Sequence, residues 1–233
     1  MQAMSRIVQA EVFEVEASFA TPYALSKAYG TLATTRAVIL KLTDAEGFVG
    51  WGEANPMQPF TKESPGEARQ ALRDVLLPAL LQQSNPEPGR IDRILDAALA
   101  DHLCAKGSVS MALLDLSGKR LGVSVASLLG GAVHASLPVL WPLGAGSAED
   151  DVRVIEDKAP QGFTTFMLKM GAAPVSEEIR RVVALEARYG ASLKFIADAN
   201  QGWTREEAHL FLSSVGGSAL VFVEQPLAKE DLD

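Results

Sequence analysis

The chain has 233 residues, of which 48% are hydrophobic and 21% charged, a composition typical of a globular protein of one or two domains. Its formal net charge of −8 at pH 7 argues against nucleic acid and anionic membrane surfaces as partners. Cys104 is the only cysteine, which excludes an intrachain disulfide and any metal site built from several cysteines.

The sequence also lacks the features of an exported or membrane-anchored protein. No apolar run approaches the roughly 20 residues that span a bilayer, and the amino terminus, Met1–Glu11, has no apolar signal-peptide core. We therefore expect a cytoplasmic protein without a membrane partner.

The amino-terminal part begins with three segments of β-strand character: Ile7–Val15, Thr35–Leu42 and Phe48–Glu53. The turn-forming segment Thr43–Gly47 joins the second and third as a hairpin. Ala17–Thr31 and Asn55–Phe60 are predicted loops. The first is long for a connection, so it is either a lid or binding loop or a surface excursion without a role.

Helices follow the strands. Ser64, Pro65 and Glu67 have the spacing of a capping box at a helix start, and Pro78 is expected to kink or end that helix early. Three more segments have helical patterns: Ile91–Ala100, Ser108–Leu121 and Ser124–Leu129. Residues 1–134 therefore read as an α+β domain.

Three polar residues of this domain are expected to be structural. His102 and His134 are isolated near predicted helix ends, and a surface or capping role is more common there than a ligand role. Asp115 lies in an otherwise apolar helix, where we expect a buried carboxylate that is hydrogen-bonded to its neighbours.

From Leu137 onward, strands and helices alternate. The predicted strands are Leu137–Leu143, Phe163–Lys169, Leu193–Asp198 and Ala219–Glu224. The helices between them are Ala148–Ala159, Val175–Tyr189 and Thr204–Val215. This α/β alternation predicts a parallel sheet over residues 135–233, either doubly wound or part of a (β/α)8 barrel. No Gly-x-Gly-x-x-Gly pattern follows a strand, which weakens a nucleotide-binding interpretation.

Three of these strands end in a charged residue. Lys169, Asp198 and Glu224 are 29 and 26 residues apart, so each should lie at the carboxyl end of its strand, where such sheets place their chemistry. Met167 shares a strand face with Lys169, and Asn200 lies just past the third strand. Any one of the three charged residues alone could be a solvated strand end, but equivalent positions in successive units favour a site.

The residue types indicate a reaction class. Carboxylates are ligands suited to Mg²⁺, with Mn²⁺ as the alternative ion. A lysine beside a divalent cation loses its proton more readily and can act as a general base. A base and a metal that binds a carboxylate oxygen can together remove a proton α to a carboxylate, and the metal would hold the resulting enediolate.

Four segments carry a family resemblance: Phe166–Gly171, Ile196–Trp203, Val223–Pro226 and Ala112–Gly131. In this order and spacing the sequence resembles the mandelate racemase and muconate-lactonizing branch of the enolase superfamily. The resemblance implies an α+β capping domain over a modified (β/α) TIM-type barrel. It also implies Mg²⁺ at three successive strand ends, with Asp198 and Glu224 matching the first two ligands. Lys169 matches the proton-transferring second lysine of the family's Lys-x-Lys pair.

By the same analogy, the two predicted loops close over a small carboxylate substrate, which places Tyr23, Tyr29 and Phe60 among the substrate-contacting residues. A homo-oligomer is also implied.

Two features depart from the family pattern. Met167 stands where the first lysine of the pair would be, so Lys169 is expected to be a weaker base or to rely more on the metal.

The second departure is the ending. The third ligand and the opposite acid/base residue should follow Glu224 on later strands, and the sequence stops at Asp233. We therefore expect a fragment carrying about half a barrel, or a chain completed by another. The first hypothesis for function is a muconate-type cycloisomerase. The alternatives are dipeptide or N-acylamino acid epimerisation, acid-sugar or hydroxy-acid dehydration, and an inactive truncated chain that only binds a partner through its open barrel edge.

Overall fold

The structure is a computed structural model that describes residues 5–24, 30–58, 60–215 and 219–231. The chain divides into two compact units, residues 1–19 with 34–135 and residues 20–33 with 136–233. The second unit differs from the predicted barrel domain by including residues 20–33. Each unit has its own hydrophobic core.

The first sheet contains β1 (Ile7–Ala24), β2 (Thr31–Asp44) and β3 (Val49–Ala54) in that order. β2 and β3 pair antiparallel, which confirms the predicted hairpin. The prediction of a loop from Ala17 was wrong, because β1 continues to Ala24. Residues 17–22 are exposed along this stretch, so the sequence there lacks the alternation of buried and exposed side chains that reveals a strand.

The helices of the first unit are α1 (Pro65–Ala71), the π-helical η1 (Leu72–Leu76), α2 (Leu77–Leu81), α3 (Pro88–Ala98), α4 (Leu103–Leu121) and α5 (Val125–Leu128). The capping box of Ser64 and Glu67 is confirmed. Pro78 does not end the helix at once, since α2 continues to Leu81. Instead the helix widens into the π-helical turn just before the proline, which lacks the N–H of a regular helical ladder.

Two further details of the first unit differ from the sequence-based expectation. α3 and α4 begin at Pro88 and Leu103, ahead of the predicted starts at Ile91 and Ser108. Asp115 is half-buried rather than buried. It does accept hydrogen bonds from its neighbours, at 2.8 Å from the Trp51 backbone N–H and 2.6 Å from the Lys119 ammonium. His134 is exposed, as expected of a surface residue, and His102 directly precedes α4 without a side-chain cap.

Two glycines let α4 lie directly on β3. A Cβ at Gly50 would stand 2.1 Å from the Ala112 carbonyl oxygen, and one at Gly52 would stand 1.9 Å from the Ser108 carbonyl oxygen. No side chain fits in that space, so glycine at these two positions fixes how closely the helix packs on the sheet.

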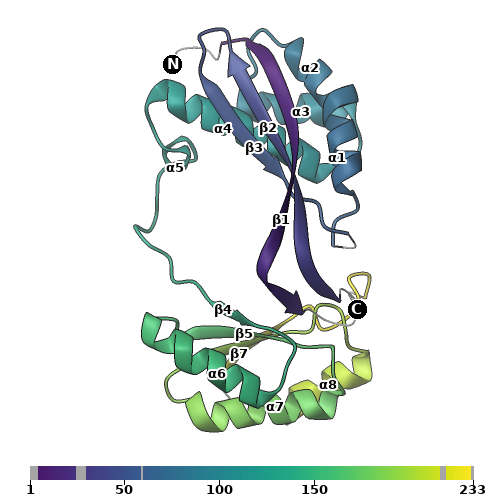
Figure 1. Ribbon diagram of the computed structural model, residues 1–233, viewed down its shortest axis with the longest axis vertical. Helices are drawn as coiled ribbons and strands as arrows, with labels where there is room; N and C mark the ends of the chain where they lie inside the picture. Colours follow the sequence, from purple (N-terminus) through teal and green to yellow (C-terminus); the bar gives the residue numbers. More distant parts are fainter. Residues whose placement is uncertain (1–4, 25–29, 59, 216–218, 232–233) are drawn as a thin grey trace. The chain divides into compact units, whose positions relative to one another are not determined.

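The second unit is a parallel sheet covered by helices. Its strands are β4 (Trp141–Leu143), β5 (Thr165–Lys169), β6 (Lys194–Asp198) and β7 (Leu220–Glu224), in that order. The helical segments are α6 (Ala148–Lys158), η2 (Ala159–Gln161), α7 (Val175–Tyr189) and α8 (Arg205–Ser214). The predicted alternation is confirmed, although β4 is shorter than expected. Figure 1 shows α6, α7 and α8 on one face of this sheet.

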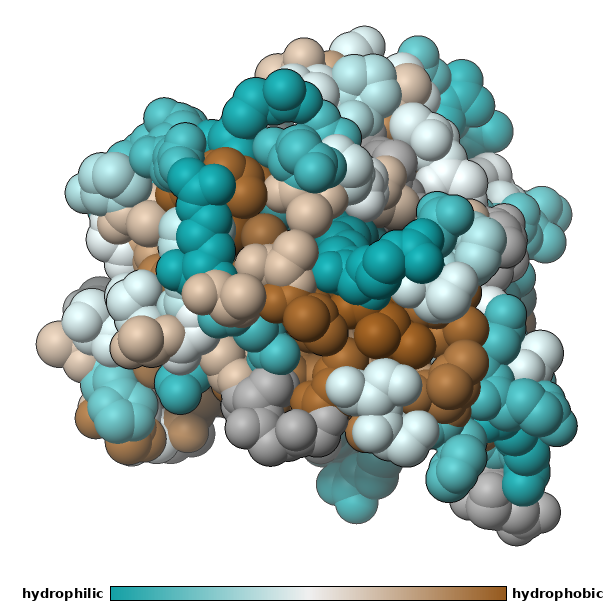
Figure 2. Space-filling model, turned by 90° about the horizontal axis from the view of Figure 1, so that it is seen from below, coloured by the Kyte–Doolittle hydropathy of each residue, from teal (hydrophilic) through white to brown (hydrophobic). Residues whose placement is uncertain are grey.

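The two faces of the second sheet differ in chemistry. Phe166 and Leu168 of β5 are buried in the core, whereas Met167 and Lys169 point to the opposite face and are half-buried. At the edge of the sheet, β7 exposes Val221 and Phe222. Figure 2 shows a continuous hydrophobic area on one face of the molecule.

Among the described residues, no helix has the length and apolar character to cross a bilayer.

Candidate functional site

Lys169, Asp198 and Glu224 form one row across three neighbouring strands, here called the charged row. Lys169 of β5 pairs in register with Asp198 of β6, and Asp198 pairs with Glu224 of β7. Parallel pairing brings the carboxyl ends of the strands together, so equivalent positions in the repeating units become neighbours. The structure thus brings together the three charged residues that the sequence singled out.

Asp198 is the centre of this row. Its side chain is 2% exposed and forms an ion pair with the ammonium of Lys169, which is 11% exposed. Its two carboxylate oxygens also accept hydrogen bonds from Asn200, one from the backbone N–H at 2.8 Å and one from the side-chain amide at 2.9 Å. These partners offset the cost of burying the carboxylate. Asn200 therefore contacts the site directly.

The chain turns back sharply after the charged row. Asn200 and Gln201 after β6 and Gln225 after β7 have left-handed backbone angles, a conformation that asparagine tolerates better than most residues. The two loops continue side by side, joined by hydrogen bonds from Gln201 N–H to the Gln225 carbonyl at 2.8 Å and from Trp203 N–H to the Pro226 carbonyl at 3.2 Å. The Asp-Ala-Asn and Glu-Gln-Pro segments therefore form one paired structure.

An apolar row lies two residues before the charged row on each strand, and therefore on the same face of the sheet. It consists of Met167, Ile196 and Phe222, which also pair in register. Met167 therefore has an apolar neighbour on β6 and stands beside the charged row without contributing a charge to it.

The predicted loop residues lie elsewhere in the chain. Tyr23 belongs to the end of β1, and Tyr29 falls outside the described residues. Phe60 is exposed in the segment between β3 and α1. Contacts of these three residues with a substrate stay a prediction.

Sequence reasoning missed three buried charged residues beside the row. Arg181 of α7 forms two hydrogen bonds with the carboxylate of Asp151 of α6, at 2.6 and 2.8 Å. Burial raises the pKa of the Asp151 carboxyl, and Arg181 acts in the opposite direction. Glu178, also on α7, is buried as well. The helical period was the signal that could have found them, because Glu178 and Arg181 lie at i and i+3 in a set completed by the buried Val182 and Leu185 at i+4 and i+7.

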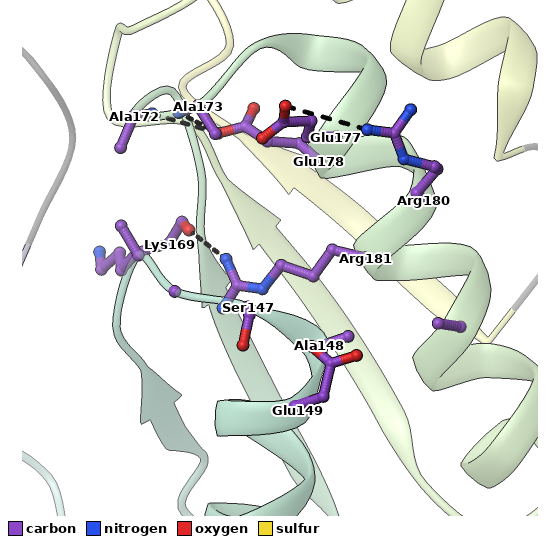
Figure 3. Close-up of a pocket in the computed structure, with 13 residues that line it drawn as sticks. Ser147, Ala148, Glu149, Lys169, Ala172, Ala173, Glu177, Glu178, Arg180 and Arg181 are labelled. Carbon is purple, nitrogen blue, oxygen red and sulfur yellow. Dashed lines mark hydrogen bonds and ion pairs between the residues drawn. The ribbon is translucent and has the colours of Figure 1, made fainter.

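A cavity of about 640 Å³ lies beside these residues, between the start of α6 and the first turns of α7 (Figure 3). Lys169, Glu178 and Arg181 line it, whereas Asp198 and Glu224 do not. Two of its exposed charges, Glu177 and Arg180, pair with each other, and Glu149 of α6 is a third. The cavity is therefore separate from the carboxylate pair of the charged row.

The side chains of the charged row fit a divalent cation in part. Among the residues that the structure describes, no group of three or more His, Cys, Asp or Glu side chains is placed to hold a metal ion. Asp198 and Glu224 nevertheless offer two carboxylates at paired positions on adjacent strands. Mg²⁺ is commonly held by one or two protein carboxylates and completes its coordination with water and substrate oxygens, so this pair is compatible with it.

Comparison with known proteins identifies the family. Residues 7–130 match the model of the mandelate racemase/muconate lactonizing enzyme N-terminal domain, and residues 150–233 match that of the enolase C-terminal domain-like family. The chain belongs to the mandelate racemase/muconate lactonizing enzyme branch of the enolase superfamily. The predicted fold class, an α+β capping domain followed by part of an enolase-like barrel, agrees with this membership.

Family members of several activities resemble the chain. L-Ala-D/L-Glu epimerase of Bacillus subtilis is 31% identical over 229 residues, which cover 97% of this chain and 62% of the epimerase. The structure of muconate lactonizing enzyme from Pseudomonas fluorescens, complexed with muconolactone, matches with a TM-score of 0.91 and 29% identity over 97% of this chain and 62% of that one.

A third relative was solved with a metal ion. It is a mandelate racemase/muconate lactonizing family protein from Roseovarius nubinhibens, complexed with magnesium, with a TM-score of 0.84 and 26% identity over 96% of this chain and 61% of that one. The chain spans about three-fifths of the length of these relatives.

Proposed function

We propose that the chain carries the base and two metal-ligand positions of an enzyme that removes the α-proton of a small carboxylate substrate with the help of Mg²⁺. Lys169 is the proposed base, and Asp198 and Glu224 are the proposed ligands. The observation that carries the proposal is the register of the charged row, which sets a lysine beside two carboxylates at the carboxyl ends of adjacent parallel strands.

Each residue of the charged row would have its own role in the proposed reaction. Asp198 and Glu224 supply hard oxygen donors, and the two hydrogen bonds from Asn200 hold the Asp198 carboxylate in place. A divalent cation bound there would polarise the substrate carboxylate and compete with Lys169 for the charge of Asp198. With the ion pair broken, Lys169 would give its ammonium proton to water, and the resulting neutral amine could then accept a proton from the carbon next to the carboxylate.

Muconate-type cycloisomerisation is the first candidate reaction, supported by the likeness to the muconolactone complex. Epimerisation of a dipeptide is the second, supported by the 31% identity to L-Ala-D/L-Glu epimerase. Both reactions involve a proton on the carbon α to a carboxylate, so the charged row suits either. Dehydration of an acid sugar or hydroxy acid stays a further alternative, and assembly as a homo-oligomer stays a prediction.

The test is exchange of α-protons for deuterium in D₂O with Mg²⁺, followed by NMR for a panel of diacids, dipeptides and acid sugars. The complete protein should exchange at least one class, and Lys169→Ala should abolish exchange. The matched control is Lys194→Ala, because Lys194 is an exposed lysine at the opposite end of β6. No exchange on any substrate would favour the alternative of an inactive chain that only binds a partner. Equal exchange by Lys169→Ala and wild type would refute the assignment of the base.

A further inference from the structure

Two charged side chains of α7 are buried next to the charged row. Glu178 is 3% exposed and Arg181 is 6% exposed, although their neighbours Glu177 and Arg180 have side chains that are 56% and 72% exposed. Charged side chains are rarely buried to this extent unless they are paired, because their removal from water costs several kcal/mol per ion. The hydrogen-bond partners of Glu178 and Arg181 therefore show which parts of the fold the two side chains hold in place.

Arg181 joins the ends of two strands to a neighbouring helix. Its guanidinium donates to the Lys169 backbone carbonyl at 2.8 Å and to the Gly144 carbonyl, just after β4, also at 2.8 Å. The same group holds Asp151 of α6 through two hydrogen bonds. Figure 3 shows the arginine reaching from α7 to the backbone of Lys169. The residue proposed as the base is thus fixed through its own carbonyl oxygen.

Glu178 joins the loops that follow β5 and β6. One carboxylate oxygen accepts the backbone N–H groups of Ala172 and Ala173, at 3.1 and 3.2 Å. The other accepts the indole N–H of Trp203 at 2.7 Å. Trp203 is itself buried, with its ring packed against Phe211 at 4.5 Å between centroids. One carboxylate therefore ties the loop after Lys169 to the loop that contains Asn200.

We propose that Glu178 and Arg181 are positioning residues of the proposed reaction and act as one clamp on the charged row. Arg181 sets the backbone of Lys169, and Glu178 sets the two loops that continue from Lys169 and Asp198. This inference rests on the proposed function, because it assigns a catalytic purpose to the placement of Lys169. Neither side chain joins the charged row or would ligate the cation.

Two conservative substitutions test the clamp. Arg181→Lys keeps the charge but loses the planar fork that reaches Asp151 and two carbonyl oxygens at once. Glu178→Gln keeps the shape but turns one acceptor oxygen into a donor amide, which then opposes an N–H group. The matched controls are Arg180→Lys and Glu177→Gln, the same changes one residue earlier on the same helix, where both side chains are exposed.

The first measurement is steady-state α-proton exchange by the complete protein, made well below the unfolding temperature of each variant. We expect both clamp variants to lose about 10- to 100-fold in kcat with little change in KM, since small misplacements of a reacting group reduce the rate by such factors. The controls should match wild type. Wild-type kcat in either clamp variant, or an equal loss in its matched control, would overturn the proposal.

The second measurement does not depend on activity. Amide hydrogen exchange followed by mass spectrometry should become faster in segments 169–174 and 199–203 of the clamp variants, without a matching change in the first compact unit. Unchanged exchange in both segments would overturn the clamp even if the enzyme is active. If wild type turns over no substrate, the proposed function fails, and local exchange still decides whether Glu178 and Arg181 hold these loops.

Discussion

Replacement of Lys169 by methionine should leave the carboxylate of Asp198 buried without its cationic partner. Breaking a buried ion pair from one side costs about 3–5 kcal/mol. Asp198 retains its two hydrogen bonds from Asn200, and hydrogen bonds to a charged group contribute about 1.5–3 kcal/mol each. We therefore expect a loss near the lower limit, about 3 kcal/mol of unfolding free energy, in the absence of divalent cations.

The double variant Lys169→Met with Asp198→Asn removes both charges and separates this effect from general damage to packing. Its loss should be smaller than the sum of the two single losses by about 0.5–3 kcal/mol, the coupling typical of residues in contact. Lys194→Met, at an exposed position at the start of β6, controls for the loss of a lysine and should change stability by less than about 0.5 kcal/mol.

The assay is urea denaturation with EDTA present, with thermal denaturation as a second probe. A loss of 3 kcal/mol corresponds to a fall in Tm of about 6–12 °C for a chain of this size. Additivity of the single losses within about 0.5 kcal/mol would show that Lys169 and Asp198 do not interact energetically. That result would refute the reasoning from the ion pair.

Further outcomes are expected for two glycines, a helix cap and the cysteine. Gly171→Ala should destabilise by more than about 2 kcal/mol in urea denaturation, because φ is +76° and the new Cβ would stand 2.6 Å from the Ala199 carbonyl oxygen. Gly162→Ala, also at positive φ but with open space, should lose only the backbone cost of about 1–2 kcal/mol. Ser64→Ala should cost about 0.5–2 kcal/mol in the same assay through loss of the capping box. Burial raises the pKa of the Cys104 thiol to about 11 from 9.0, so at pH 8 a disulfide reagent should modify it about 100-fold more slowly than in the urea-unfolded chain, and equal rates would contradict this shift. The raised pKa also adds stability that is complete below about pH 9 and is lost as the pH rises through 11.

The features that the sequence predicted well are those with a strong local cause. Alternating strands and helices implied parallel strands, and parallel strands bring their carboxyl ends together, so the neighbourhood of Lys169, Asp198 and Glu224 followed from spacing alone. The cap at Ser64 was predictable for a similar reason, since it depends on residues three positions apart.

The features that escaped prediction depend on contacts distant in the sequence. β1 extends to Ala24 as part of the first sheet, although its residues 17–22 are exposed and show no alternation. Glu178 and Glu177 are adjacent and chemically identical, yet only Glu178 reaches Trp203, 25 positions later in the chain. A local sequence pattern cannot show this contact, because the contact depends on which distant residue packs against Glu178 in the folded chain.

The charged row and the apolar row have different implications for substrate choice. The epimerase of Bacillus subtilis and the muconate lactonizing enzyme of Pseudomonas fluorescens share this fold, with TM-scores of 0.89 and 0.91, while their names describe different reactions. A fold held in common cannot by itself select a substrate. Under the proposed function, the charged row would suit any α-proton abstraction, so the choice of substrate would depend on side chains outside it. Met167 is well placed for that purpose, because it shares the strand face of Lys169 and lies in the apolar row with Ile196 and Phe222. Under the proposed function, an uncharged thioether there would favour an apolar substrate group over an anionic one on that side of Lys169.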